Sequence, residues 1–176
     1  AGETISLGIG QGYNNFTMLQ MATAYATIAS GGLRFKPRVV REIKDMVQHT
    51  SHQVASDALE PLPLKPEHVN VIRNAMHGVT IEGTSARVFA GAGYTSGGKT
   101  GTAQVPRDDG PGYKADVNIG TFAGFGPVED PKFAMVVRVD HPRDVKFAES
   151  SAAPTFGEIA KFLLQYYHVQ PTRAVK

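Results

Sequence analysis

The chain has 176 residues, of which 41% are hydrophobic and 19% are charged, a composition typical of one globular domain. Its 18 Lys and Arg against 16 Asp and Glu give a formal net charge of +2, and no basic run is present, which argues against nucleic-acid binding. The sequence contains no cysteine, which excludes disulfide bonds and a thiol nucleophile.

The first predicted element is a helix over residues 17–30, with the sequence TMLQMATAYATIAS. Its apolar residues recur at the i, i+3, i+4 and i+7 spacing of one helix face. Thr17 and Gln20 form a capping-box pattern at the start, and the glycines at 31 and 32 supply a stop. The pattern therefore predicts both ends of this helix.

Less regular sequence follows this helix. Residues 36–43 predict a strand, whereas residues 45–65 are polar, contain two prolines and predict a loop or insertion. Pro66 suits the first position of a second helix. The apolar stripe of that helix consists of Val69, Ile72, Met76 and Val79.

The second half of the chain predicts three strands and a final helix. Residues 97–105, 117–125 and 133–139 have the pattern of strands, and the Gly-Pro and Asp-Pro pairs within 126–131 mark a tight turn. Pro154 begins the last helix. Because consecutive strands joined by short turns pair antiparallel, the predicted fold class is α+β, an antiparallel β-sheet covered by helices.

The segment GYTSGGKTGTAQVP, residues 93–106, fits two different motifs. Gly93 with Gly98-Lys99-Thr100 matches the phosphate-binding pattern G-x-x-x-x-G-K-[ST], and Lys99-Thr100-Gly101 matches the K-T-G of enzymes that form acyl-serine bonds. A phosphate loop needs a buried strand before it and a helix beginning at its lysine. Here the upstream FAGAGYTS is no buried strand, and TGTAQVP is a poor helix start. The flanks therefore favour an exposed edge strand and predict no nucleotide.

An extended strand at this segment suits acyl-transfer chemistry. Lys99 and Gly101 would face one side, and Thr100 and Thr102 the other. The lysine supplies positive charge beside a nucleophile, the glycine lets a substrate lie against the backbone, and the threonine hydroxyls can hold a carboxylate. A free backbone N–H can stabilise an oxyanion. The alternative interpretation is a polar edge strand with a solvated lysine.

The SGGKTGTAQV segment resembles the third motif of the penicillin-recognising serine acyltransferases. Residues 5–40, 82–88, 121–142 and 150–167 are similar to one branch, the class B (monofunctional) penicillin-binding proteins. The five segments follow the family's order and leave out little besides the predicted loop. The resemblance implies a penicillin-binding/serine β-lactamase-like transpeptidase fold, of which residues 1–176 would form the C-terminal part of a single domain.

The resemblance also implies roles for individual residues. Lys99 would be the catalytic lysine that orients the active-site hydroxyls, and the Thr102 N–H would be one half of the oxyanion hole. Thr100 and Thr102 would hold the carboxylate of the substrate or antibiotic. Gly101 and Ala103 would complete the substrate-binding strand.

Two motifs that the family requires are missing from this sequence, the S-x-x-K nucleophile and S-x-N. Only Ser96 is followed by a lysine three positions later, and the two intervening glycines oppose the helix that would place both on one face. Tyr13-Asn14-Asn15 fits a Y-x-N variant, but it precedes the first helix and is not expected to be catalytic. We expect an upstream segment or a second chain to complete the site, and this chain alone to be inactive.

The family implies a peptidoglycan D,D-transpeptidase that cross-links stem peptides through an acyl-serine intermediate and is acylated by β-lactams. It would act at the extracytoplasmic face of the bacterial membrane. The sequence shows no signal peptide and no run of the roughly 18 to 20 apolar residues of a membrane span, so the anchor is expected outside it. The alternatives are a serine β-lactamase or D,D-carboxypeptidase, with water as acceptor, and a non-catalytic β-lactam sensor domain.

No metal or cofactor is predicted. The six histidines show neither H-x-x-x-H nor H-E-x-x-H spacing. Asp108, Asp109 and Asp116 lie between two predicted strands and could pair for acid–base chemistry. A solvated loop beside the substrate groove is the expected interpretation of these carboxylates.

Overall fold

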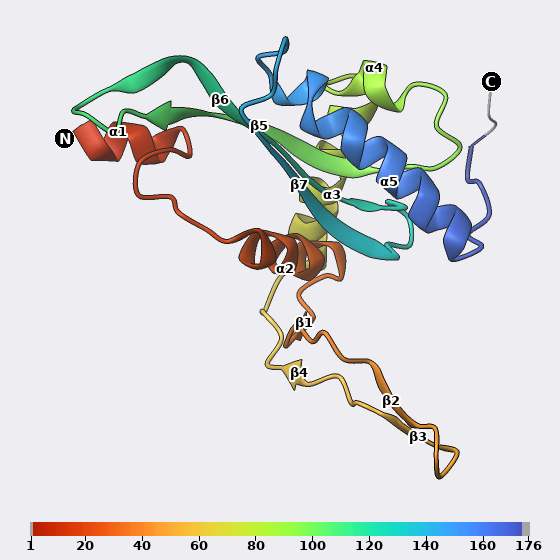
Figure 1. Ribbon diagram of the computed structural model, residues 1–176. Coiled ribbons are helices and arrows are strands. Elements are labelled where there is room, and N and C mark those ends of the chain that lie inside the picture. Colours follow the sequence, from red (N-terminus) through yellow and green to blue (C-terminus); the bar gives the residue numbers. More distant parts are fainter. Residues whose placement is uncertain (1, 174–176) are drawn as a thin grey trace.

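The centre of the structure is a three-stranded antiparallel sheet (Figure 1). This computed structural model describes residues 2–173. The strands are β5 (Gly97–Pro106), β6 (Tyr113–Gly126) and β7 (Phe133–Asp140), in the spatial order β5-β6-β7. All three predicted strands are therefore confirmed, and β6 begins four residues earlier than its apolar pattern indicates.

Helices pack on both faces of this sheet. α2 (Met18–Ala29) lies against β6 and β7, and α3 (Pro66–Ile81) lies against β5. α5 (Ala152–Tyr166) crosses the opposite face over β6 and β7 (Figure 1). The predicted α+β class, an antiparallel sheet covered by helices, is confirmed.

The sheet divides the apolar core in two because side chains alternate along β6. Phe122 packs on one face with Phe156 of α5, with ring centroids 4.6 Å apart. Phe125, three positions later, packs on the other face with Met76 of α3 and Ala29 of α2. Both phenylalanines of β6 are fully buried, so the two helix layers hold the central strand from either side.

The capping box predicted for the first long helix is present. The Gln20 N–H donates to Thr17 Oγ1 at 3.1 Å, and the Thr17 N–H donates to Gln20 Oε1 at 2.9 Å. Pro66 is the first residue of α3, as predicted. Pro154 lies within the first turn of α5, which begins at Ala152 rather than at the proline.

The predicted strand over residues 36–43 is wrong. Strand β1 (Arg34–Phe35) ends before it, strand β2 (Glu42–Asp45) starts at its end, and the residues between them are exposed. Pro37 lacks the N–H that a strand interior must donate, which breaks the run into two short strands.

The segment predicted as a loop contains two further short strands. β3 (Thr50–Gln53) pairs with β2, and β4 (Ala58–Leu59) pairs with β1. The β2–β3 hairpin projects away from the central sheet (Figure 1). The sequence also did not indicate three short helical elements: α1 (Gly2–Gly8), α4 (Ala86–Phe89) and the 3₁₀ turn η1 (Ala148–Ser150).

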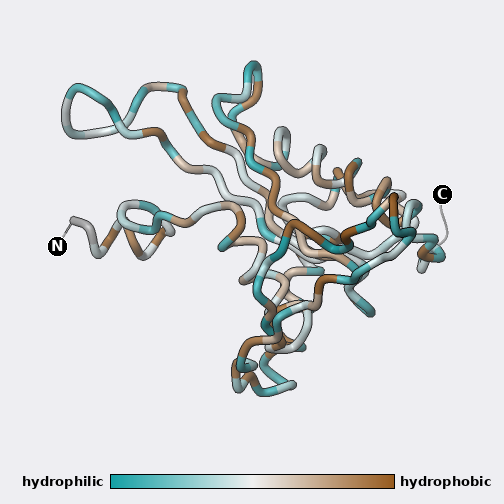
Figure 2. Tube along the Cα trace, turned by 60° about the horizontal axis from the view of Figure 1, so that its bottom comes forward, coloured by the Kyte–Doolittle hydropathy of each residue, from teal (hydrophilic) through white to brown (hydrophobic). Residues whose placement is uncertain are grey.

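The β5–β6 hairpin reaches well beyond the helices that cover the sheet. Its tip, between Pro106 and Tyr113, is coloured mainly hydrophilic in Figure 2, far from the C-terminal end of the chain. The strands pair in register from Gly97–Phe125 to Gln104–Asn118, and the register shifts before Pro106. The covered half of β5 is thus rigidly positioned, whereas its distal end lies in solvent.

The surroundings of Gly124 in β6 and Gly157 in α5 predict that alanine at these two positions changes the stability of the fold in opposite directions. A Cβ at Gly124 of β6 would overlap the Gly97 carbonyl oxygen and lie 3.1 Å from Gly98 Cα, so Gly124→Ala should lower the free energy of unfolding by about 1–3 kcal/mol. At Gly157 of α5 a Cβ would meet nothing closer than 3.6 Å, so Gly157→Ala should raise it by up to about 1 kcal/mol. Urea denaturation measures both, and equal midpoints for the two variants would contradict the packing described.

Candidate functional site

The segment that fits two motifs forms strand β5, with Lys99 in its covered half. Lys99 pairs with Ala123 and Thr102 pairs with Gly120, both on β6. A phosphate loop requires a helix N-terminus at its lysine, and an extended, paired backbone excludes one here. The prediction of an extended edge strand is confirmed, since in the described part of the chain β5 pairs with β6 alone.

The Lys99 side chain is exposed and folds back along its own strand. Its Nζ donates to the Thr100 carbonyl oxygen at 2.8 Å and lies 3.5 Å from Thr100 Oγ1. Among the side chains that the structure describes, no carboxylate oxygen lies within 4.0 Å of this ammonium, and the ion pairs involve other cations. The positive charge is therefore available to a group outside the described residues.

The hydroxyl of Thr100 is held by a residue from another part of the chain. Thr84 Oγ1 lies 3.3 Å from Thr100 Oγ1, and either hydroxyl can donate. Thr84 belongs to the EGTSARV segment that leads into α4. The sequence pointed to this segment only through the family resemblance, and no residue pattern within it indicated a contact with the K-T-G strand.

Thr102 and Gly101 are held by the elements beside β5. The Ala148 N–H of η1 donates to Thr102 Oγ1 at 3.1 Å, and Thr121 Oγ1 of β6 donates to the Gly101 carbonyl oxygen at 3.1 Å. Ala103 follows, half-buried and paired with Ile119. The structure thus places four predicted substrate-binding residues on one strand, with both threonine hydroxyls already oriented by neighbours.

A small recess of about 320 Å³ is lined in part by Thr84. Arg87 of α4 and Glu149 of η1 line it, so a cation and a carboxylate share it without forming an ion pair within 4.0 Å among the described side chains. Hollows of about 480 and 580 Å³ lie elsewhere: one beside α5 and one between α2 and the β1–β4 pair.

The aspartates between β5 and β6 are ion-paired at the exposed hairpin tip. Arg107 Nε lies 2.9 Å from Asp109 Oδ1, and Lys114 Nζ lies 2.7 Å from Asp108 Oδ2. The hydrogen bond from Arg107 holds the pKa of Asp109 below its usual range. Both carboxylates are engaged with cations and exposed to solvent, which agrees with the solvated-loop interpretation for Asp108 and Asp109. Asp116 is exposed as well, but it lies within strand β6 and not in the loop.

The Y-x-N segment takes part in a local turn. The Asn14 side-chain amide donates to the Leu7 carbonyl oxygen at 3.2 Å and to that of Gln11 at 3.3 Å, which ties the linker before α2 to the end of α1. Across the described part of the chain, no group of three His, Cys, Asp or Glu side chains is placed to hold a metal ion. No helix in that part is long and apolar enough to span a membrane.

A histidine of α3 contacts the C-terminal segment behind the start of β5. His77 Nε2 lies 2.7 Å from an Arg173 guanidinium nitrogen, and the Arg173 backbone N–H donates to the Gly93 carbonyl oxygen at 3.1 Å. Burial, and then the Arg173 charge, lower the pKa of His77 from 6.5, against a raising effect of Glu129. Neutral His77 can accept the hydrogen bond from Arg173, and protonated His77 cannot.

This contact predicts a loss of stability on acidification. Well above pH 6.5 His77 is neutral in both states; as the pH falls through this value, the unfolded chain binds the proton before the folded chain does, so the free energy of unfolding falls. We expect His77→Gln to reduce the stability difference between about pH 7.5 and about pH 5.5, measured by urea denaturation at each pH. An unchanged difference would show that His77 does not carry this pH dependence.

Comparisons with known proteins agree with this geometry. The family model described as the penicillin binding protein transpeptidase domain matches residues 1–161. Stage V sporulation protein D of Bacillus subtilis is 32% identical over 97% of this chain and 26% of its own length. Peptidoglycan D,D-transpeptidase MrdA of Haemophilus influenzae is 29% identical over 94% of this chain and 26% of its own.

A solved structure shares the fold over nearly the whole chain. Penicillin binding protein 3 from Mycobacterium tuberculosis, complexed with aztreonam, superposes with a TM-score of 0.78 at 26% sequence identity, covering 97% of this chain and 39% of that one. The chain spans about a quarter of the length of the curated relatives described above. The match therefore concerns one part of those longer proteins.

Proposed function

Because the chain belongs to the penicillin-binding protein transpeptidase family, in its class B branch, we propose that it forms part of a peptidoglycan D,D-transpeptidase. Its substrates would be peptidoglycan stem peptides, and β-lactams would acylate it. One relative is named a peptidoglycan D,D-transpeptidase, and a solved relative was complexed with the β-lactam aztreonam. By the same analogy, it would act at the extracytoplasmic face of the bacterial membrane.

The observation that carries this proposal is the K-T-G strand itself. Lys99 has a free ammonium on an edge strand, and its neighbour Thr100 has a hydroxyl oriented by Thr84. We assign Lys99 the role of the catalytic lysine, whose charge lowers the cost of removing a serine proton. The Thr102 N–H would be one half of the oxyanion hole, a donor type that contributes about 3–4 kcal/mol in acyl-transfer enzymes.

The remaining strand residues would bind the substrate. Thr100 and Thr102 would hold its carboxylate, and Gly101, which has no side chain, would let the peptide lie against the backbone. Ala103 would extend this wall. The Ala148 N–H supports this assignment, because it holds the Thr102 hydroxyl from the side of η1 and so limits its rotamers.

The proposed reaction has two steps. A serine Oγ attacks the carbonyl carbon of the penultimate D-alanine, a C–O bond forms, the C–N bond breaks, and the departing D-alanine nitrogen takes up a proton. The amine of a neighbouring stem peptide then attacks the ester carbonyl, an amide forms, and the serine Oγ leaves and regains its proton. This serine would come from outside the 176 residues, since only Ser96 has S-x-x-K spacing, and it directly precedes the extended strand that carries Lys99 instead of sharing a helix turn with it.

A β-lactam adduct tests the proposal. We expect mass spectrometry to find no covalent adduct on the 176-residue chain incubated with benzylpenicillin. A single adduct is expected on a longer chain that also carries S-x-x-K, on that serine. An adduct on the isolated chain, or none on the longer one, would contradict the assignment. The second outcome would leave the non-catalytic sensor as an alternative, because a sensor can bind the drug without forming a covalent adduct.

An acceptor assay separates transfer from hydrolysis. The acylated protein is expected to pass its acyl group to an added amine such as a stem-peptide side chain. Release of the free acid alone, at a rate that the amine does not change, would instead favour the β-lactamase or D,D-carboxypeptidase alternative.

A further inference from the structure

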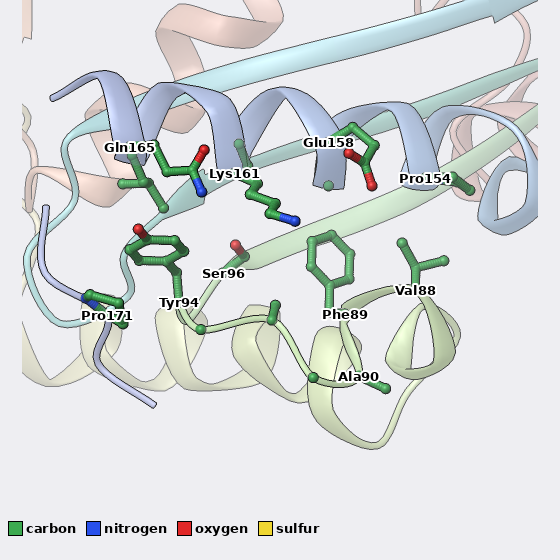
Figure 3. A pocket seen from close by; sticks show the side chains of 16 residues that line it. Val88, Phe89, Ala90, Tyr94, Ser96, Pro154, Glu158, Lys161, Gln165 and Pro171 are labelled. Carbon is green, nitrogen blue, oxygen red and sulfur yellow. The ribbon is translucent and has the colours of Figure 1, made fainter. Parts of the chain in front are cut away.

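The chain turns back after α5 and passes beneath that helix. We call residues 167–173 the strap, since they return to the segment that leads into β5. In Figure 3, Pro171 of the strap and Tyr94 of that segment lie together beneath α5 and line the same pocket. The strap lies beyond residues 1–161, the part of the chain that the family model matches. The match to the family therefore does not account for it.

Two residues of the strap hold the entry to the K-T-G strand. The backbone N–H groups of Thr172 and Arg173 both donate to the Gly93 carbonyl oxygen, at 2.9 and 3.1 Å. The Arg173 guanidinium continues to α3, where a nitrogen lies 2.7 Å from His77 Nε2 and can donate to the neutral ring. The strap thus connects α3 to the chain just before β5.

The same histidine lies against the first residue of β5. A Cβ at Gly97 would lie 3.5 Å from the His77 backbone nitrogen, so α3 and β5 pack closely at this point. Residues 93–97 are buried apart from a half-buried position 94, and they run from the strap contact to this packing contact. Together with Arg173 and His77 they form a closed ring of contacts around the entry to β5. Loss of the Arg173–His77 contact opens the ring at its one side-chain hydrogen bond.

Charged groups face the His77 ring from two neighbouring segments. Arg173 approaches it from the strap, and Glu129 acts on it from the turn between β6 and β7. The facing residue of β5 is Gly97, which carries no charge, and on α3 itself Arg73 donates to a backbone carbonyl group of the β6–β7 turn. Burial first, and then the Arg173 charge, hold the pKa of His77 below 6.5 against the opposing effect of Glu129. The closed ring of contacts therefore contains the neutral imidazole.

We propose that the strap is a positioning element for the K-T-G strand, which acid opens at the contact between His77 and Arg173. The closed strap limits the motion of residues 93–97 and so of Lys99, which follows them on β5. A protonated imidazole cannot accept the guanidinium hydrogen and repels its charge, so the strap leaves and the entry to β5 becomes mobile. The effect on catalysis rests on the proposed transpeptidase function, whereas the effect on the motion of residues 93–97 does not.

Hydrogen exchange on the 176-residue chain tests the strap without any acylation. At about pH 7.5, Arg173→Ala should lower the protection factors of the amides of residues 93–99 by about two- to tenfold, the size of one net hydrogen bond. The amides of α2 report global unfolding and should keep their protection. Arg38→Ala, at an exposed arginine between β1 and β2, is the matched control and should change nothing.

Acid should produce the same opening through His77. Between about pH 7.5 and about pH 5.5 the protection factors of residues 93–99 should fall by up to about tenfold, because a histidine released from the contact regains a pKa near 6.5. His77→Gln retains a hydrogen-bond acceptor that does not titrate, and it should remove most of this fall. Protection factors already correct for the intrinsic pH dependence of exchange, so the remaining difference reports the opening itself.

Acylation measures whether the strap positions the reacting groups. In the proposed longer transpeptidase, Arg173→Ala should slow acylation by benzylpenicillin by about two- to tenfold at about pH 7.5. The factor should be smaller at about pH 5.5, where the wild-type strap is already partly open, whereas a residue that only supports folding would not give a smaller factor in acid. Arg173→Lys keeps the charge and a donor and should recover part of the rate.

Three results overturn the proposal. The first is unchanged protection of residues 93–99 in Arg173→Ala, and the second is an equal loss of protection in α2, which would mean global destabilisation alone. The third is wild-type acylation by Arg173→Ala at both pH values. A longer chain that benzylpenicillin does not acylate at all would instead contradict the proposed function, and hydrogen exchange would still decide whether the strap holds the entry to β5.

Discussion

Replacing Lys99 with methionine is expected to slow acylation by a β-lactam by a factor of about 10²–10⁴ in the proposed longer transpeptidase, the size of a lost acid–base contribution. The exposed ammonium contacts only Thr100 in the described part of the chain, so the substitution removes the charge and leaves the packing of β5 intact. Stopped-flow acylation by a fluorescent penicillin measures the rate.

Two control variants test whether the loss of rate is specific to the Lys99 ammonium. Lys36→Met removes an exposed lysine far along the chain from the K-T-G strand and should acylate at the wild-type rate. Lys99→Arg keeps the charge on a planar, bulkier group and should recover only part of the rate. Wild-type acylation by Lys99→Met would remove the catalytic role of this lysine and leave the polar edge strand as the better interpretation.

Truncating Phe156 is expected to cause the largest loss of stability. Its ring is fully buried and meets the rings of Phe122, Phe133 and Phe89, with centroids 4.6, 6.0 and 6.1 Å away. Phe156→Ala removes the side chain that joins α5 to the sheet and to α4, so the free energy of unfolding should fall by about 3–5 kcal/mol. Urea denaturation followed by circular dichroism measures it.

Phe162, on the same helix, provides the matched control. It is 63% exposed and stacks on Tyr166, with ring centroids 6.1 Å apart. Phe162→Ala should change the free energy of unfolding by less than about 1 kcal/mol, since little apolar surface leaves the core. A similar loss for both variants would mean that the buried aromatic cluster does not hold α5 in place.

Local patterns sufficed for the long elements. The capping box at Thr17, the proline at position 66 and the alternating residues of β7 each act within a few residues, so they predicted α2, α3 and the sheet correctly. They failed between residues 36 and 43, where Pro37 interrupts the ladder: β2 starts only at Glu42 and pairs with the nearby β3, whereas β1, just before this range, pairs with a distant strand. Arg34, for example, pairs with Leu59.

The face that α5 buries was also only partly predictable. The helical spacing of the sequence predicts that Phe156, Ile159, Ala160, Leu163 and Tyr167 line one face. Phe156 and Ala160 are buried, but Tyr167 lies beyond the helix end and is exposed. Leu164, almost fully buried, replaces Leu163 as the residue that faces the core. Both leucines fit a helical pattern, and only the direction in which α5 crosses the sheet selects between them.

For the site, the sequence by itself determined that Lys99 lies in an extended strand, because Gly101, the threonines and Pro106 oppose a helix at that position. Only the tertiary structure decided which groups orient its neighbours. Thr84 meets Thr100 across 16 residues, and Ala148 meets Thr102 across 46. Such contacts depend on how α4 and η1 pack beside β5. No local sequence pattern predicts them, because the two residues of each pair lie too far apart in the chain to influence each other's backbone conformation.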